Sequence, residues 1–387
     1  MNRSKKSDAV YDVVIVGAGP AGSAAATFLA KGGARVALVD GARFPRPKAC
    51  AGWVNAKAVR EFRFVKDACR KVKAATFKRL VFHSPDLAAT AEFSSRSVVG
   101  YLVRRENFDA ELVRAARGAG AKTILGTKAV TVEIGEREAA AVLADGRRIT
   151  GRILIGADGV HSTVARAAGL RDRWPDGQQV VCLEKRVPLA ARQRKTCFRD
   201  GAIHMAPAFG QAMGYAWAFP GADYVNVGVG VRTGEGPPLA ALYEAWAAGL
   251  RSKGFLPAEA ETDGPEGGIV PAGAALEYEN QVGKRLLLIG DAGGFAAAAS
   301  GEGIYPAIRS AALASRCVLA ALQADRGEKK GSTCQDELLQ FRRLWREQLA
   351  AYLQMPNVNV AFLLPLIYTN QEIADRFARA FLFGENL

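Results

Sequence analysis

The chain has 387 residues, of which 49% are hydrophobic and 23% are charged, as in a globular enzyme with a large buried core. Lysine and arginine give it a net charge of +14, but the basic residues are scattered or form short runs without interleaved aromatic residues, which argues against nucleic-acid binding. The six cysteines form no C-x-x-C pair and the three histidines do not cluster, so no metal site is predicted.

The start of the chain bears on the cellular compartment. No apolar signal-peptide segment precedes the first predicted strand, and the apolar run at residues 13–16 is too short to cross a bilayer. Scattered cysteines without a secretion signal indicate a reducing environment. We therefore expect a cytoplasmic protein.

Residues 13–40 contain the pattern Gly17-x-Gly19-x-x-Gly22 between an apolar strand and a helix rich in small residues. Gly17 allows the tight turn after the strand, and Gly19 lets the backbone approach a diphosphate without a side chain in the way. Gly22 lets the helix pack closely on the sheet. Because both flanking elements are present, the glycines predict a dinucleotide-binding turn.

The residues around this turn predict which dinucleotide it binds. Pro20 and Ala21 open the helix, whose free N–H groups and dipole favour a diphosphate. Asp40 ends the second strand and is followed by Gly41, where the carboxylate can accept a hydrogen bond from a ribose hydroxyl. The same carboxylate would repel a 2′-phosphate, so FAD or NAD is predicted over NADP.

The rest of the chain alternates between helical and strand patterns. Apolar spacing and turn signals predict a helix at 55–68, strands at 76–82 and 89–93, a helix at 105–118, a hairpin at 139–155 around Asp145-Gly146, a strand-rich region at 178–231, a strand at 285–290 and a helix at 303–323. From residue 336 onward the sequence predicts helices broken at Pro356 and Pro365.

These elements predict an α/β protein in which one domain is built from separated segments. It has a Rossmann-type cofactor domain, an inserted antiparallel-sheet substrate domain and a helical C-terminal segment. The ranges are 1–75, 98–170 and 284–325 for the cofactor domain, 76–97 and 171–283 for the substrate domain, and 326–387 for the C-terminal segment.

Two further strands end in an acidic residue, as the second strand does. Acids at the carboxyl edge of a parallel sheet suit hydrogen bonds to ribose or polyol hydroxyls. The alanine-rich helix that follows has free N–H groups that can face the edge of a ring and stabilise negative charge there. The residues concerned are Asp158, Gly159 and Asp291 at the strand ends, and Gly301, Gly303 and Ile304 at the helix opening.

An aromatic strand lies in the predicted substrate domain. Alternation along residues 214–220 places Tyr215, Trp217 and Phe219 on one face of the sheet and two alanines on the other. Such a wall can line a pocket for an apolar chain. It can equally fill the core between the sheet and the cofactor domain, and the geometry alone leaves both interpretations open.

Taken together, these motifs resemble the FAD-binding pattern of flavoproteins with the p-hydroxybenzoate hydroxylase fold, over almost the whole chain to about residue 325. The resemblance implies FAD as cofactor. Arg105, in the pattern R-x-x-F-D, stands where family members place a cofactor-contacting arginine. The family would place Asp291 on the ribityl chain, Asp158 near the pyrophosphate, and residues 301–304 beside the flavin pyrimidine edge. Asp40 stands where a glutamate is common, with the same expected role.

Two motifs are similar to those of geranylgeranyl reductases. Residues Cys50, Ala51 and Gly52 match their C-x-G loop, which lies close to the isoalloxazine. The run from Tyr215 through Trp217 to Pro220, followed by N-V-G at residues 226–228, matches their Y-x-W-x-F-P…N-V-G signature. The resemblance implies catalytic roles for Cys50, Tyr215 and Trp217 and cofactor contacts for the C-x-G loop. A lone cysteine is also common as a small buried hydrophobe.

The resemblance implies an FAD-dependent oxidoreductase that reduces carbon–carbon double bonds of an isoprenoid or another lipophilic substrate. A flavin-dependent monooxygenase, hydroxylase or halogenase on the same fold is the alternative. The W-x-W-x-I-P pattern of halogenases is absent, because Tyr215 and Phe219 replace its first tryptophan and its isoleucine. A flavin-binding protein without turnover is a third hypothesis, and a nicotinamide dehydrogenase is a fourth.

The sequence also bears on the source of electrons and on the role of the C-terminal segment. No second G-x-G-x-x-G pattern is present, so electrons are expected from transiently docked NAD(P)H or from an acidic electron-donor protein. The apolar run at residues 358–368 is compatible with closing the pocket, with peripheral contact at a membrane, and with a helix packed on the protein body.

Overall fold

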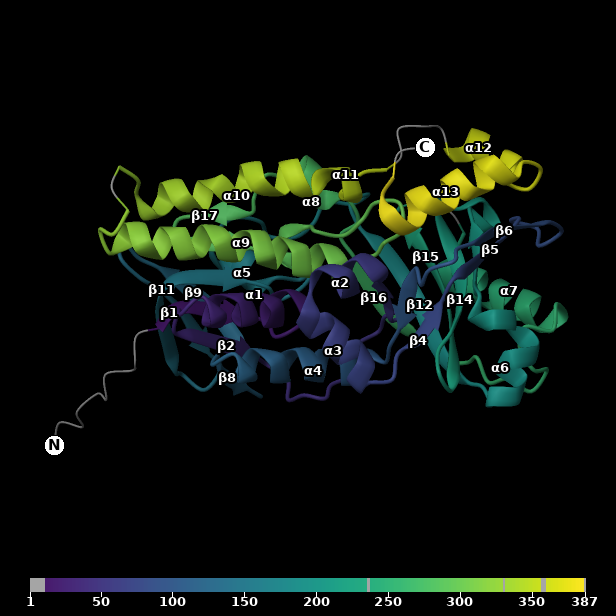
Figure 1. The fold of residues 1–387 in the computed structure, drawn as a ribbon, viewed down its shortest axis with the longest axis horizontal. Helices are drawn as coiled ribbons and strands as arrows, with labels where there is room; N and C mark the ends of the chain where they lie inside the picture. The colour runs from purple at the N-terminus through teal and green to yellow at the C-terminus, as the bar shows by residue number, and fades with distance from the viewer. Residues whose placement is uncertain (1–10, 235–236, 330, 356–359, 386–387) are drawn as a thin grey trace.

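The computed structural model describes residues 11–234, 237–329, 331–355 and 360–385. Two large sheets lie next to each other along the long axis of the molecule, and helices cover both (Figure 1). Among the described residues, no helix combines the length and apolar character that crossing a membrane requires.

The first sheet has eight strands, and its parallel centre forms the dinucleotide-binding part of the fold. Strands β18, β11, β1, β2 and β8 are parallel neighbours, whereas β17, β10 and β9 pair in antiparallel fashion. The predicted hairpin at Asp145-Gly146 is confirmed by the pairing of β10 with β11. The strands are β1 (Tyr11–Val16), β2 (Val36–Asp40), β8 (Lys122–Leu125), β9 (Ala129–Ile134), β10 (Ala139–Leu143), β11 (Arg148–Gly156), β17 (Val282–Gly283) and β18 (Leu286–Leu288).

Helices cover this sheet, with α9 and α10 running side by side in Figure 1. Alanines of α1, such as Ala24 and Ala25, are fully buried against Val13 and Ile15, so the helix packs tightly on the sheet. The predicted helix at 55–68 is two helices, because Phe62 adopts an extended backbone between them. The helices are α1 (Pro20–Lys31), α2 (Ala56–Glu61), α3 (Arg63–Lys71), α4 (Arg105–Gly118), α5 (Thr163–Ala167), α8 (Ala274–Glu277), α9 (Ile304–Asp325), α10 (Cys334–Gln348) and α11 (Ala350–Leu353).

The second sheet has seven strands in the order β16, β12, β15, β14, β13, β5 and β6. All neighbours are antiparallel except β13 and β5, which run parallel, so the predicted antiparallel sheet contains one parallel pair. The two strands come from distant chain segments, and a long connection permits parallel pairing where a hairpin does not. The strands are β5 (Arg79–His83), β6 (Thr90–Ser94), β12 (Val180–Pro188), β13 (Ile203–Pro207), β14 (Gly214–Pro220), β15 (Tyr224–Arg232) and β16 (Glu266–Val270).

Three short strands form a third sheet: β3 (Trp53–Asn55), β4 (Ala75–Phe77) and β7 (Gly100–Leu102). The exact boundaries predicted for the two domains stay a prediction.

Helices cover both faces of the second sheet (Figure 1). Helix α7 (Leu239–Ser252) packs on the face that carries Ala216 and Ala218, whereas α12 (Val360–Ile367) and α13 (Gln371–Phe383) pack on the face that carries Trp217 and Phe219. The alternation predicted for this strand is therefore confirmed. Helix α6 (Ala191–Cys197) lies near α7 in Figure 1.

Pro365 lies inside α12, so the predicted break at this residue was wrong. Leu364 and Ile367 of the same helix are buried against the second sheet, and this packing outweighs the hydrogen bond that proline cannot make. The other predicted break, Pro356, lies outside the described residues.

Candidate active site

A cavity of about 930 Å³ lies where the carboxyl edge of the first sheet meets the second sheet. Residues that follow or end β1, β2, β11 and β18 line one part of it, as expected for a ligand site of a parallel sheet. Residues of β12, β13, β14, β15 and α13 line another part. Every residue predicted to bind cofactor or act in catalysis lines this cavity, except Gly22 and Gly52.

The glycine turn after β1 has the geometry that the sequence predicts. Gly17 has a φ of +101°, and a Cβ at Gly22 would lie 1.7 Å from the Gly17 carbonyl oxygen. Gly22 therefore serves helix packing and does not line the cavity. Gly19 is the N-cap of α1, with Pro20 at the first helical position, and its neighbours leave room for a ligand on the cavity side.

Asp40 holds the same turn together through its carboxylate. Oδ2 accepts a hydrogen bond from the Ala18 N–H at 2.7 Å, and Oδ1 accepts one from the Ala42 N–H at 2.8 Å. Asp40 and Gly41 both line the cavity. Since each carboxylate oxygen has further acceptor capacity, this arrangement leaves Asp40 able to accept from a ribose hydroxyl.

Asp158 combines a place in the cavity wall with a structural role that the sequence did not reveal. Its carboxylate accepts hydrogen bonds from the Ser162 hydroxyl at 2.5 Å and from the Val164 N–H at 3.0 Å, and so caps α5. Burial raises the pKa of Asp158, although both hydrogen bonds act in the opposite direction. Gly159 lies beside it in the wall.

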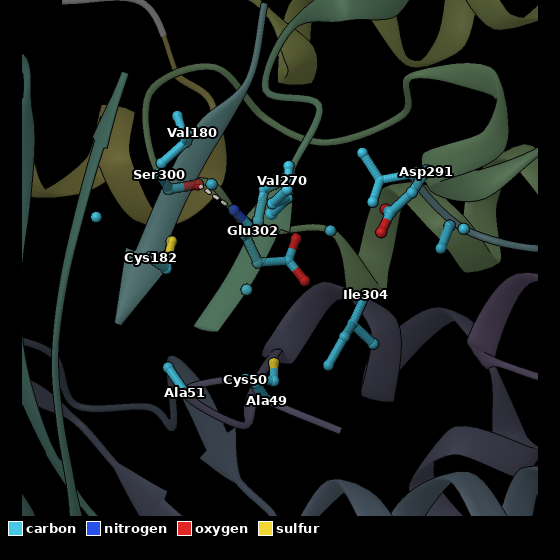
Figure 2. Close-up of a pocket in the computed structure, with 18 of the residues that line it drawn as sticks. Ala49, Cys50, Ala51, Val180, Cys182, Val270, Asp291, Ser300, Glu302 and Ile304 are labelled. Atoms are coloured by element: carbon cyan, nitrogen blue, oxygen red, sulfur yellow. Dashed lines mark hydrogen bonds between the residues drawn. The ribbon is translucent and has the colours of Figure 1, made fainter. Parts of the chain in front are cut away.

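Asp291 follows β18 and presents its carboxylate to the cavity (Figure 2). No donor from the described residues reaches this carboxylate within hydrogen-bond distance. Burial raises its pKa, while Lys48 and Arg105 lower it. A half-buried carboxylate that faces the cavity without a protein donor can accept from the hydroxyls of a ribityl chain, so the residues present fit FAD.

Arg105 is held rigidly at the start of α4. Its guanidinium makes two hydrogen bonds to the Asp109 carboxylate, at 2.8 and 2.9 Å, and Arg46 lies 3.4 Å from the same carboxylate. Burial opposes the charge of Arg105, but Asp109 and the Cys50 side chain outweigh burial and raise its pKa. Asp109 is the aspartate of the R-x-x-F-D pattern, so the sequence contained this partner although it was not assigned a role.

The loop of Cys50, Ala51 and Gly52 is fixed on two sides. Gly52 has a φ of +78°, and a Cβ there would lie 2.2 Å from the Val103 carbonyl oxygen. The Gly52 N–H donates to the Cys50 Sγ at 3.4 Å, and the Cys50 N–H donates to Oε1 of Glu184 at 3.1 Å. Cys50 and Ala51 thus face the cavity from a loop tied to β12 of the second sheet (Figure 2).

Glu184 also receives a hydrogen bond from Asn226 of β15, the strand paired with the aromatic strand, and sequence reasoning missed Glu184. The Trp217 indole N–H donates to Oδ1 of Asn226 at 2.6 Å, and Nδ2 of Asn226 donates to Oε2 of Glu184. Gly228 makes room for the indole, because a Cβ there would lie 2.2 Å from the ring. Burial raises the pKa of Glu184, against the hydrogen bonds from Asn226 and Cys50.

The loop before α9 contacts the aromatic strand as well. The Tyr215 hydroxyl donates to the Ser300 carbonyl at 2.6 Å. Burial raises the pKa of the Tyr215 hydroxyl, which keeps it neutral. Gly301, Gly303 and Ile304 line the cavity beside this contact.

Glu302 anchors the beginning of α9. Its carboxyl group accepts a hydrogen bond from the Tyr305 N–H at 2.8 Å and one from the Tyr352 hydroxyl at 2.9 Å. Burial raises the pKa of Glu302 to about 7, because the loss of hydration outweighs these bonds. Figure 2 shows Glu302 across the cavity from the Cys50 loop.

Aromatic and aliphatic side chains dominate the remaining wall. Trp53 stacks on Phe381 of α13 with ring centres 5.7 Å apart, and Tyr215 meets the same ring edge-on. Leu364 of α12 and Phe377 of α13 complete this wall. The aromatic strand therefore both fills the core and lines the pocket, because Trp217 belongs to a buried cluster and also lines the cavity.

Comparisons with known proteins agree with this geometry. A family profile described as an FAD binding domain matches residues 10–343. The chain is 30% identical to the digeranylgeranylglycerophospholipid reductase of Methanocaldococcus jannaschii, over 89% of this chain and 84% of the relative. It is 33% identical to the menaquinone reductase of Mycolicibacterium smegmatis, over 79% of this chain and 75% of the relative. A solved geranylgeranyl bacteriochlorophyll reductase-like protein from Thermoplasma acidophilum shares the fold, with a TM-score of 0.77, 20% identity and 97% of each chain covered.

Proposed function

This chain belongs to the FAD-dependent geranylgeranyl reductase family and is an FAD-dependent oxidoreductase, and we propose that it reduces carbon–carbon double bonds of an isoprenoid or a similarly lipophilic substrate. One observation carries the proposal: a single cavity joins a dinucleotide-binding turn to a wall of aromatic and aliphatic side chains. Such a cavity can hold a polar cofactor and an apolar substrate against each other.

The residues that would hold FAD follow from their places in the cavity wall. Gly17, Gly19 and the first turn of α1 would face the pyrophosphate, and Asp40 would accept from the adenosine ribose. Asp291 would accept from the ribityl hydroxyls, and the backbone at 301–304 would face the pyrimidine edge. When bound and reduced, FAD supplies a hydride, and saturation of the double bond also takes up one proton.

The chain's own residues would bind and orient the substrate. Trp217, Phe377 and Leu364 would hold the apolar chain and exclude water from the reacting bond. The Tyr215 hydroxyl is committed to the Ser300 carbonyl, so Tyr215 would position the loop rather than donate a proton. Cys50 faces the cavity beside Arg105 and is our candidate for contact with the reacting double bond.

Product analysis tests this function. Purified protein reduced with dithionite without oxygen should convert a polyprenyl substrate into a product that carries two additional hydrogen atoms per reduced bond. The same reaction with oxygen should give no oxygenated product. A product that contains a new oxygen atom, or a halogen when halide is present, would instead favour the monooxygenase or halogenase hypothesis.

We also propose that electrons reach the flavin from outside this site, from NAD(P)H or an acidic donor protein. The net charge of +14 supports an acidic protein donor. Reduction of the flavin by such a donor should slow steeply as salt increases, whereas reduction by NADH or NADPH should depend far less on salt.

We further propose a cytoplasmic location with peripheral membrane contact at α12. Leu364 of this helix lines the cavity, while Phe362 on the same helix is 72% exposed. Met355 also lines the cavity and is 38% exposed. Exposed apolar side chains on the helix that also contributes to the cavity wall would let a lipophilic substrate pass from a bilayer into the site.

A further inference from the structure

One buried carboxylate accepts hydrogen bonds from the Cys50 loop in the cavity wall and from the buried Asn226 behind the aromatic strand. Glu184 is 5% exposed, and its two oxygens accept separately from the Cys50 N–H and from the side chain of Asn226. Asn226 is fully buried and accepts from the Trp217 indole. The carboxylate therefore links the C-x-G loop, defined by residues 50–52, to the aromatic strand.

The direction of each hydrogen bond in this chain is fixed. An indole N–H can only donate, so Asn226 must turn its oxygen toward Trp217 and its amide N–H group toward Glu184. The backbone N–H of Cys50 is also a donor. Position 184 therefore needs an acceptor at both terminal atoms, and an ionised carboxylate meets this requirement whereas an amide does not.

The position of Glu184 in the sheet explains why it can reach both walls. It lies on β12, paired with Gly228 of β15 on one side and with Glu266 of β16 on the other. Gly228 leaves space for the Trp217 ring above the sheet. Cys50, Glu184 and Trp217 all line the cavity, and the fully buried Asn226 connects Glu184 to Trp217 behind the cavity wall.

We propose that Glu184 is a positioning residue that sets the separation between the C-x-G loop and Trp217, the two walls between which the substrate double bond lies. This inference rests on the proposed function for its catalytic consequence. Its structural part, the fixed loop, needs no knowledge of the substrate.

The test compares Glu184→Gln with the control Glu266→Gln in the FAD-loaded protein. Glu266 is the exposed cross-strand neighbour of Glu184, so the same chemical change is made one strand away. The first readout is alkylation of Cys50 by iodoacetamide, measured by peptide mass spectrometry relative to Cys197 on α6. The second is the separate change in kcat and KM for an isoprenoid substrate.

We expect Glu184→Gln to increase alkylation of Cys50 several-fold over that of Cys197, because the loop loses its fixed acceptor. We expect kcat to fall by roughly tenfold, the factor that corresponds to one lost charge-assisted hydrogen bond, with a smaller change in KM. Glu266→Gln should leave both readouts as in the wild type. Flavin content and melting temperature establish that each variant is folded.

Unchanged Cys50 alkylation and unchanged kcat in folded Glu184→Gln would overturn the inference. If this variant does not fold, Glu184→Asp carries the same prediction, since the shorter carboxylate cannot reach both donors. Increased alkylation without isoprenoid reduction by any variant, wild type included, would refute the proposed function and leave the role of Glu184 in fixing the loop. Isoprenoid reduction by the wild type with unchanged alkylation in Glu184→Gln would support the proposed function and refute the role of Glu184 in fixing the loop.

Discussion

The hydroxyl group of Tyr215 donates a hydrogen bond of 2.6 Å to the carbonyl group of Ser300. The two residues are 85 positions apart, and the contact ties the aromatic strand of the second sheet to the loop that opens α9. This loop is the part of the chain expected to face the flavin pyrimidine edge. The substrate wall and the cofactor wall are therefore mechanically connected at this point.

Replacing Tyr215 with phenylalanine removes the hydroxyl group and keeps the aromatic ring, so it tests the role of the hydroxyl alone. The Ser300 carbonyl would lose its donor, which should lower the free energy of unfolding by about 1–2 kcal/mol. We expect turnover to fall as well, because the loop beside the flavin loosens. Chemical denaturation and steady-state kinetics measure the two effects.

Tyr243→Phe is the matched control for this change. The Tyr243 hydroxyl donates to the Thr262 carbonyl at 2.8 Å, in a buried contact of α7 that does not line the cavity. It should lower stability by a similar amount and leave kcat unchanged. Equal kcat in Tyr215→Phe and Tyr243→Phe would contradict a role for the Tyr215 hydroxyl beyond stability.

Gly22→Ala should abolish FAD binding. Alanine at a helical position normally adds up to about 1 kcal/mol of stability. Here its methyl group would lie 1.7 Å from the Gly17 carbonyl oxygen, so α1 must move away from the glycine turn, at a cost of about 1–3 kcal/mol. We expect the purified variant to be colourless and less stable than the wild type.

Gly118→Ala provides the comparison, because it lies at the end of α4 with open space around the new methyl group. It should retain FAD and be as stable as the wild type or more so. The flavin absorbance per protein measures FAD content, and the denaturation midpoint measures the stability of each variant. Full flavin content in Gly22→Ala would show that the close approach of α1 to the turn is not required.

Glu302 should make stability depend on pH in a defined window. Its pKa is raised from 4.5 to about 7 in the folded protein, so the folded state holds a proton that the unfolded state has released. The resulting stabilisation is fully present below about pH 4.5 and is lost as pH rises to about 7, with a total of the order of 3 kcal/mol. Denaturation at a series of pH values measures this slope.

Glu302→Gln should remove that slope. Glutamine resembles the neutral acid: its oxygen can accept from the Tyr305 N–H and its amide can donate to the Tyr352 oxygen. The variant should therefore lose less stability than the wild type between pH 4.5 and 7. Parallel curves for the two proteins would show that Glu302 is not protonated on folding.

Phe362→Ser should weaken binding to lipid vesicles. Phe362 is 72% exposed on α12, the helix that also places Leu364 in the cavity wall. Sedimentation with vesicles of phosphatidylcholine and phosphatidylglycerol measures the bound fraction. Leu339→Ser on α10, which removes another exposed apolar side chain, should leave binding unchanged. Equal vesicle binding by the wild type and Phe362→Ser would place the membrane contact elsewhere or refute it.

The elements that the sequence predicted are those whose determinants are local. The glycines of residues 17–22 fix a turn through steric limits within a few residues, and the alternation of Tyr215, Trp217 and Phe219 follows from strand geometry alone. Helix 105–118 was predicted with the bounds that the structure has, because its apolar spacing and its length are both visible in the sequence.

The hydrogen-bonded chain through Glu184 could not be predicted, because its partners are far apart in sequence. Cys50 and Glu184 are separated by 134 positions. Nothing in the residues around Glu184 marks it as the residue that accepts hydrogen bonds from both Cys50 and Asn226. The contribution of α12 and α13 to the cavity depends on the packing of the C-terminal helices on the second sheet. Asp158 shows a third limit, since its helix-capping bonds depend on the path of residues 159–164.

The most direct test of the central claim is anaerobic mixing of the reduced, FAD-loaded protein with a panel of polyprenyl and aromatic compounds, followed by the return of oxidised-flavin absorbance. We predict that an isoprenoid with carbon–carbon double bonds restores this absorbance without oxygen, and that its saturated analogue does not. If every isoprenoid leaves the flavin reduced and only oxygen reoxidises it, the protein does not use its apolar cavity for alkene reduction.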